Sequence, residues 1–263
     1  MRWKKLANWL PAIPGFTHAA MPFYFEGDIY FSPRDAMHRS HIYRARFNPR
    51  NGKLGAAHKY LEPGPHGSFD DCGAMVSWVQ RNGPNVFCYY IGWNVPVTVP
   101  FRNSLGLAID RHKLYGPVCD RDLYNPYGVG SCSESMEYYL SVVGWEAHDL
   151  RPRPRYHIVR AHPHSIAITF KDASEYAIAR PCVIGDEMWY CYRGEQYRIG
   201  YATQTEGDWT RRDEDVGITV SETGFDDEAV CYPHVFDHEG QRFMLYCGNG
   251  YGKTGFGLAI LER

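Results

Sequence analysis

The chain has 263 residues, a formal net charge of −2 and an aromatic content of 15%. The near-neutral charge gives no electrostatic basis for binding nucleic acid or an anionic membrane, and no apolar run reaches the roughly 18 residues of a membrane-spanning helix. The length suits one large all-β domain, and the 20 Tyr and 7 Trp favour half-buried strands or a surface that stacks on sugars.

The N-terminus and the cysteines bear on the compartment. Residues 1–11 begin like a secretory signal peptide but lack its long apolar region, so we interpret them as mature protein. None of the eight cysteines forms a C-x-x-C pair or a zinc-like spacing with histidine. Cys88, Cys191 and Cys247 occupy equivalent places in aromatic segments, as small buried residues do in a reducing compartment. We expect a cytoplasmic protein; a secreted protein with disulfides is the alternative.

The predicted elements are short strands that group, in chain order, into five units. Proline and glycine interrupt every longer segment, and helical periodicity is almost absent. The units span about residues 19–60, 67–115, 129–163, 175–212 and 229–261. About 50 residues per unit suits a four-stranded blade. We therefore predict an all-β fold, a five-bladed β-propeller in a single domain, over a β-sandwich, which would not explain the repetition.

The repetition itself is an aromatic strand, a loop marked by glycine or charge, and a second strand that ends in a small residue. It occurs at residues 87–93 with 104–108, 188–194 with 197–202, and 243–250 with 255–259, and more weakly at 29–32 with 41–45. Recurring units of this kind are typical of radial β architectures.

Five segments across nearly the whole chain carry a resemblance to a known family; they are residues 67–73, 89–94, 103–109, 179–181, and 232–234 continuing through 246–250. The pattern resembles the five-bladed β-propeller glycoside hydrolases of families 43 and 32, especially a branch found in bacterial polysaccharide gene clusters. The resemblance implies a site in the central funnel, where the innermost strand of each blade begins.

In that family a first-blade aspartate is base or nucleophile, a second-blade aspartate tunes a pKa, and a third-blade glutamate is the acid. The resemblance places Asp71 at the second position, with Asp70 beside it, and either Glu134 or Glu137 at the third. Residues 19–22 stand at the first position and contain no carboxylate. Relatives of this kind sometimes hold calcium in the central channel, but no sequence feature here requires it, and we expect no cofactor and no metal site.

The residues themselves point to carboxylate chemistry at the same places. Glycosidic bond cleavage needs a proton donor and usually a second carboxylate. Asp70 and Asp71 precede an apolar strand, and Asp227 and Glu228 precede another in the same relative place. We take Asp71, Glu137 and Glu228 as candidate catalytic residues; turn or surface acids are the alternative.

Cationic and aromatic residues near predicted strand ends are candidates for substrate binding. Arginines in a funnel can bind a carboxylate or phosphate through two hydrogen bonds, and aromatic rings can stack on a sugar. Core packing and salt bridges between blades are the alternatives. Four acids are included, and the candidates are Arg34, Asp35, Asp70, Trp93, Glu134, Arg180, Arg193, Tyr197, Asp227, His234, Asn249 and Tyr251.

The predicted function is that of a carbohydrate-active enzyme that works on a glycosidic bond, with hydrolysis as the default. Because the first-blade carboxylate is missing, three alternatives stay open: a glycoside phosphorylase, a sugar transferase with an arginine-rich anion site, or a carbohydrate-binding propeller without catalysis. The expected partner is a carbohydrate or a sugar phosphate, and the oligomeric state stays open.

Overall fold

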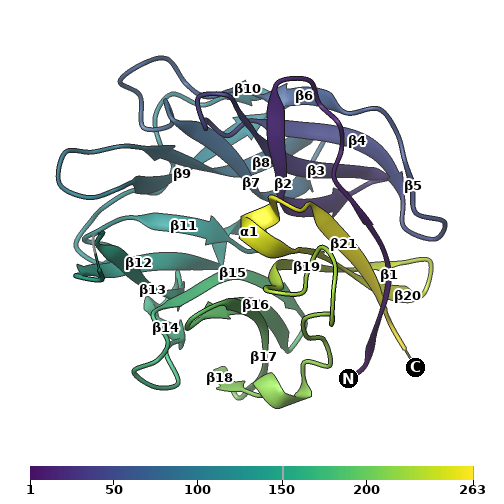
Figure 1. Cartoon of the computed structure of the whole chain (residues 1–263). Helices are drawn as coiled ribbons and strands as arrows, with labels where there is room; N and C mark the ends of the chain where they lie inside the picture. Colours follow the sequence, from purple (N-terminus) through teal and green to yellow (C-terminus); the bar gives the residue numbers. More distant parts are fainter. Residues whose placement is uncertain (150, 263) are drawn as a thin grey trace.

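The computed structural model describes residues 1–149 and 151–262, and these form an all-β, five-bladed propeller. Figure 1 shows the strands arranged as sheets around a common centre, with the innermost strands β2, β7, β11, β15 and β19 closest to it. The predicted fold is thereby confirmed. None of the described helices is long and apolar enough to cross a membrane.

The strands group into blades in chain order, with the innermost strand first. Blade 1 contains β2 (Phe16–Phe25), β3 (Asp28–Asp35), β4 (Ile42–Asn48), β5 (Lys53–Leu54) and β6 (His58–Leu61). Blade 2 contains β7 (Gly73–Asn82), β8 (Asn85–Asn94), β9 (Arg102–Ile109) and β10 (His112–Lys113). Blade 3 contains β11 (Val129–Cys132), β12 (Tyr138–Glu146), β13 (Arg153–Arg160) and β14 (Ser165–Ile168). Blade 4 contains β15 (Ala177–Ile184), β16 (Glu187–Arg193), β17 (Tyr197–Thr205) and β18 (Asp208–Arg211).

Blade 5 combines the two ends of the chain. Its strands are β19 (Cys231–His238), β20 (Gln241–Cys247), β21 (Phe256–Leu261) and the N-terminal β1 (Trp3–Trp9). The antiparallel pairing of β1 with β21, seen in Figure 1 as purple beside yellow, closes the ring. A single parallel bridge between Tyr156 and Ala177 joins blades 3 and 4.

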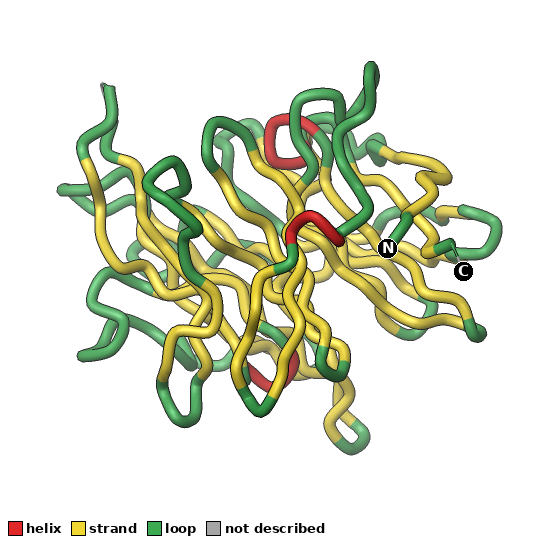
Figure 2. Tube along the Cα trace, turned by 90° about the horizontal axis from the view of Figure 1, so that it is seen from below, coloured by secondary structure: helices red, strands yellow, loops and turns green. Residues whose placement is uncertain are grey.

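Short helices complete the description: η1 (Glu134–Met136), η2 (Asp213–Asp215) and α1 (Asn249–Gly252). Figure 2 shows the strands running between two layers of loops. We call the side where the innermost strands begin the start face, and the side where they finish the end face.

A glycine on the third strand of a blade explains the repeated sequence pattern. A Cβ atom on Gly106 would lie 2.2 Å from the ring of Tyr90, and one on Gly200 would lie 2.4 Å from the ring of Tyr190. Gly257 faces Tyr246 at 2.8 Å in the same way. The buried tyrosine of the second strand therefore packs flat against the third strand, because glycine leaves space for its ring.

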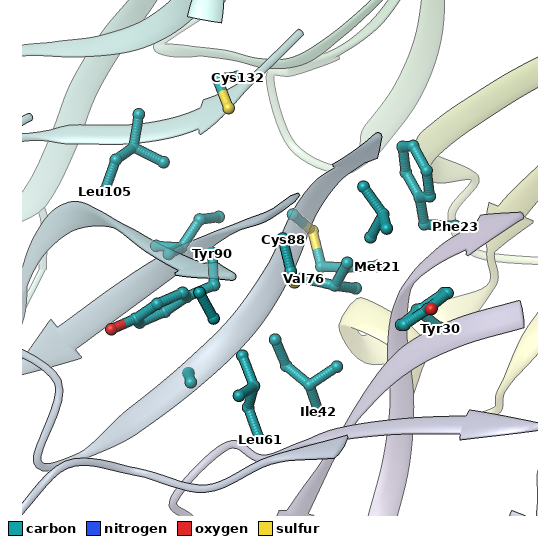
Figure 3. Packing of buried hydrophobic residues seen from close by; sticks show 14 of the residues in the cluster. Met21, Phe23, Tyr30, Ile42, Leu61, Val76, Cys88, Tyr90, Leu105 and Cys132 are labelled. Atoms are coloured by element: carbon teal, nitrogen blue, oxygen red, sulfur yellow. The ribbon is translucent and has the colours of Figure 1, made fainter. Parts of the chain in front are cut away.

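The core fills the space between blades. Figure 3 shows part of it, with Ile42 and Leu61 of blade 1 in one cluster with Val76, Cys88 and Tyr90 of blade 2. Cys88, Cys191 and Cys247 are all buried, and all eight cysteines are free thiols.

Three innermost strands share a kink before a proline. Met21, Arg180 and Tyr232 have φ of 56°, 61° and 55°, and each precedes a proline at an irregularity in strand pairing. This left-handed conformation is costly for residues other than glycine. A bulge of this kind redirects a side chain that would otherwise alternate between the two faces of the strand.

Candidate functional site

Arg180 lies across the centre of the propeller rather than on a free surface. Its side chain is 2% exposed and donates hydrogen bonds to the carbonyl oxygens of Val76 (3.1 Å) and Ser77 (2.7 Å). A longer bond of 3.4 Å reaches the carbonyl of Pro22. Arg180 therefore connects blade 4 to blades 2 and 1, and these bonds compensate for its burial.

His234, a second substrate-binding candidate in the interior, is a buried core histidine. Its ring stacks on Phe23 with 3.8 Å between centroids, and Nε2 contacts the carbonyl oxygen of Tyr24 at 3.1 Å. Burial, followed by the positive charge of Arg180, lowers the pKa of His234 to about 3. The residue is neutral at physiological pH, which leaves it no charge with which to hold an anion.

The channel does not suit a calcium ion. Calcium requires several oxygen ligands, mostly carboxylates, whereas the buried cation of Arg180 occupies the centre. No group of three or more His, Cys, Asp or Glu in residues 1–149 and 151–262 could hold a metal ion.

Glu134 and Glu137 lie at the end face, away from Asp71. Both are exposed and belong to the connection between β11 and β12. Glu134 lines a cleft of about 640 Å³ together with residues from the C-terminal ends of β2, β7, β15 and β19, such as Phe25, Arg81 and Asp237. Asp71 instead precedes the first residue of β7. The structure thus separates the two carboxylates that the resemblance would pair.

Asp70 and Asp226 are buried structural acids in equivalent loops of blades 2 and 5. Asp70 accepts hydrogen bonds from the Tyr90 hydroxyl (3.2 Å) and from Lys113 Nζ (2.6 Å). Asp226 accepts from the Tyr246 hydroxyl (3.0 Å) and from Lys5 Nζ (2.7 Å). Each acid thereby connects the second strand of its blade to the outermost strand, and both acids are almost completely buried.

Asp71 has one oxygen without such a partner. Oδ2 accepts from the backbone N–H of Gly67 at 2.9 Å and lies 3.6 Å from the exposed ring of His66. Oδ1 is buried, and no N–H or O–H donor among the described residues reaches it. The thiol of Cys72 lies beside the carboxylate, and burial together with Asp71 raises the pKa of that thiol.

Asp227, Glu228 and Asn249 form a loop contact on the start face. Asn249 Nδ2 donates to Asp227 Oδ1 at 2.6 Å, and Asn249 Oδ1 accepts from the backbone N–H groups of Glu228 and Ala229. The amide of Asn249 is therefore fully used within the protein. The side chain of Glu228 is exposed.

Arg193 is the centre of a group of aromatic rings on the start face. Its guanidinium lies 5.2–5.4 Å from the ring centroids of Tyr176, Tyr197 and Tyr251, and it donates to the Tyr251 hydroxyl. Arg193 Nε is buried without a hydrogen-bond partner. No carboxylate of the described residues forms an ion pair with Arg193.

The three aromatic candidates differ in how much they could offer a ligand. Tyr197 is 4% exposed, and its hydroxyl pairs with that of Tyr156 at 2.6 Å. Trp93 is half-buried and donates to Ser40 Oγ at 3.4 Å. Tyr251 is 39% exposed. Of the three, Tyr251 is therefore the most accessible ring.

Arg34 and Asp35, adjacent in sequence, have opposite roles. Asp35 accepts from the backbone of Met37 and Arg39 and from the side chains of Arg39 and His41. Burial alone would raise its pKa, but these hydrogen bonds lower it to about 2. Arg34, in contrast, has no carboxylate partner among the described residues and lines a cleft on the start face.

The structure also reveals residues that the sequence argument missed. Met21 is buried at the first-blade position. His18 and Lys253 line the same cleft as Arg34, and Gly252 brings the segment of α1 against the backbone of Ala20. A lone histidine and a lone lysine give no sequence signal, because only the closure of the ring brings residues 18 and 253 together.

Comparison with solved structures relates the fold to carbohydrate-active enzymes. One structure described as a glycoside hydrolase is 12% identical and superposes with a TM-score of 0.62, covering 99% of this chain and 92% of its own. The GH43_1 enzyme from Xanthomonas citri, complexed with xylotriose, is 13% identical with a TM-score of 0.57, over 97% of this chain and 90% of its own. At these identities the likeness concerns the fold.

Comparison at the sequence level identifies close relatives. No protein-family model matches the chain. Two uncharacterized proteins of Mycobacterium tuberculosis, MT1551 and Rv1502, are each 39% identical over 94% of this chain and 93% of their own length. The chain therefore belongs to the family of these two mycobacterial proteins, a family with the fold of GH43-like glycoside hydrolases.

Proposed function

We propose that this protein binds an anionic carbohydrate on its start face and acts on a glycosidic or glycosyl-phosphate bond with a single proton-transferring carboxylate, Asp71. The proposal rests on a difference in hydrogen bonding between Asp71 and the aspartates near it. The neighbouring acids Asp70, Asp226 and Asp227 accept hydrogen bonds from side chains within the protein. Asp71 accepts a backbone hydrogen bond on Oδ2, whereas its buried Oδ1 has no N–H or O–H donor among the described residues.

Three cations of the start face lack the carboxylate partners that other cations there have. Arg34, Arg193 and Lys253 have no carboxylate partner among residues 1–149 and 151–262. Unpaired cations in one region favour a ligand that brings negative charge, such as a phosphorylated or carboxylated sugar. Tyr251 adds an accessible ring that could pack against a sugar face. The solved GH43_1 relative in fold was complexed with a sugar, xylotriose.

A site with Asp71 as its single proton-transferring acid limits the reactions that the protein can catalyse. Two-carboxylate hydrolysis needs a second acid on the other side of the sugar. Met21 stands at the first-blade position, and Glu137 lies at the end face. A phosphate nucleophile or an activated phosphate leaving group needs only one proton-transferring group, because the phosphate itself supplies the negative charge. Phosphorolysis or transfer therefore fits the residues better than hydrolysis, with Glu228 as the remaining candidate for a second acid.

A matched pair of variants tests the role of Asp71. Purified protein is assayed on aryl glycosides and glycosyl phosphates, with and without added phosphate. Asp71→Asn should lower kcat by roughly 10²–10⁴-fold with little change in ligand affinity. Asp227→Asn, in the equivalent loop, should stay within a few-fold of the unmodified protein. Equal activity of the two variants would contradict the assignment.

A second function, carbohydrate binding without catalysis, is favoured by one observation. Buried Met21 replaces the carboxylate that the resemblance would require in blade 1. Calorimetric binding of sugars or sugar phosphates, unaffected by Asp71→Asn and accompanied by no turnover on any of the substrates above, would select this function.

A further inference from the structure

A cleft of about 950 Å³ opens on the start face beside the innermost strand of blade 1. Its walls come from three distant parts of the chain: the linker between β1 and β2, the segment at the end of β3, and the residue that follows α1. The cleft is built only when blade 5 closes against blade 1, because residue 253 lies more than 200 positions from the other walls.

One side of this cleft is cationic. His18, Arg34, His38 and Lys253 line it, and no Asp or Glu is among its lining residues. None of the four forms an ion pair with a carboxylate of the described chain. The nearest acid in sequence, Asp35, forms an ion pair with Arg39 and a hydrogen bond with His41 instead. Four basic groups thus converge without an internal counter-charge.

The proximity of these groups affects the pKa of His18. Burial, and then the positive charges of Arg34, Lys253 and His38, lower its pKa to about 4. Its Nδ1 contacts the Thr17 hydroxyl at 2.9 Å, so the remaining ring nitrogen is the one available to a ligand. An anion in the cleft would relieve the repulsion that this arrangement imposes.

Most of the remaining lining residues are apolar. Leu10, Pro11, Ile13, Pro14 and Phe16 are among them, and Leu10 is 52% exposed. A cleft lined by both cationic and apolar residues suits a ligand with two parts, a charged group and a hydrophobic or planar substituent.

We propose that this cleft binds the phosphate group of an organic phosphate, with Arg34 and Lys253 as its principal charged contacts and the 10–16 linker against the apolar substituent. The two cations Arg34 and Lys253 match a phosphate dianion better than a single carboxylate. The planar guanidinium of Arg34 can bind two phosphate oxygens at once, and the ammonium of Lys253 acts as a point charge.

The position of α1 relates this cleft to the rest of the start face. Tyr251 in α1 accepts from Arg193, and Lys253, at the C-terminal cap of α1, lines the cleft. A ligand with its phosphate in the cleft could therefore extend past α1 toward Arg193. The identification of that ligand as a phosphorylated sugar rests on the proposed function. Phosphate binding itself does not, because it is measured separately from turnover.

Titration calorimetry of the full chain tests the charged wall, with inorganic phosphate and glucose 1-phosphate as probes and glucose as the uncharged comparison. We expect both phosphates to bind, more weakly as salt increases, and glucose to bind much less. Arg34→Met and Lys253→Met should each weaken phosphate binding at least tenfold. Lys4→Met, at an exposed lysine of β1 outside the cleft, should have no effect. Unchanged phosphate binding in both cleft variants would overturn the proposal.

A second probe tests the apolar wall. Leu10→Ser, at a largely exposed position, should weaken 4-nitrophenyl phosphate several-fold and leave inorganic phosphate unchanged. An equal change for both probes would contradict the assigned role of the linker. Repeating the phosphate titration with the Asp71→Asn variant separates the two proposals. If this variant still binds phosphate but has lost turnover, both proposals are supported. If the unmodified protein binds phosphate but shows no turnover, the phosphate cleft is supported and the proposed catalysis is contradicted.

Discussion

The loops that lead into β7 and β19 have the same Phe-Asp-Asp sequence and most of the same structure. Phe69 and Phe225 pack against glycines of the adjacent strand ends, Gly92 and Gly248. The first aspartate of each loop is buried and binds a tyrosine hydroxyl and a lysine ammonium of its own blade. This shared part is a structural device that connects the second strand to the outermost one.

The two loops differ at the second aspartate. Asp227 receives the side-chain amide of Asn249, and that hydrogen bond is the main reason that its pKa is lowered. Trp93 occupies the place of Asn249, directly after the equivalent glycine, and its indole donates to Ser40 instead. Asp71 therefore lacks the amide that occupies Asp227. One substitution in a neighbouring strand end is enough to separate a structural acid from a candidate functional one.

The largest effect on stability should come from the shared part of the two loops. Asp70→Ala or Asp226→Ala would leave a tyrosine hydroxyl and a largely buried lysine without their partner, so we expect each to lower the free energy of unfolding by about 3 kcal/mol. Asp71→Ala should cost less than about 1 kcal/mol. Urea denaturation measures all three, and a large difference between the Asp70 and Asp226 variants would show that the loops are not equivalent.

A somewhat smaller effect is expected at the glycines that face the buried tyrosines. Gly106→Ala places a methyl group within 2.2 Å of the Tyr90 ring, and overpacking of this kind costs about 1–3 kcal/mol. Gly144→Ala, in β12 with no atom within 4 Å of the new Cβ and no left-handed backbone, separates this clash from the general cost of replacing glycine. Thermal unfolding of the two variants gives the comparison; equal losses would argue against the packing explanation.

The amide contact that only blade 5 has should contribute about 1 kcal/mol. Asn249→Ala removes the acceptor for two backbone N–H groups and the donor to Asp227, a loss comparable to that of a helix cap. The midpoint of urea unfolding measures the change. If the Asp227 carboxylate is held by this amide, the double variant Asn249→Ala/Asp227→Asn should be no less stable than Asn249→Ala alone.

The smallest expected effect concerns the thiol beside Asp71. Burial and the Asp71 carboxylate raise the pKa of Cys72, so Asp71→Asn should lower it and increase the rate of alkylation by iodoacetamide at pH 8 a few-fold. Cys119 is an internal control, because burial and the carboxylates of Asp122 and Asp120 raise its pKa to about 11. Peptide mass spectrometry reads both sites, and an unchanged Cys72 rate would show that the carboxylate does not act on the thiol.

Much of the fold could be predicted from the sequence. The spacing of aromatic strands and turn residues indicated five blade-sized units, because strand periodicity and turn chemistry are local properties. The glycine in the third strands of blades 2, 4 and 5 was visible as part of the repeat, although its purpose, space for a tyrosine ring, required the packed sheet. The pairing of β1 with β21 was not predicted, since it joins residues about 250 positions apart.

Local sequence patterns were enough to show that this chain forms repeated β units and which acids and cations stand near strand ends. Which of those groups lack a partner within the protein depends on how the blades pack together. Asp70 and Arg180 form hydrogen bonds with residues of other strands. Glu137 lies at the opposite face from Asp71. Arg34 and Lys253 line the same cleft only because blade 5 closes on blade 1. The physical reason is that burial and pairing depend on contacts between distant segments, which local sequence patterns do not encode.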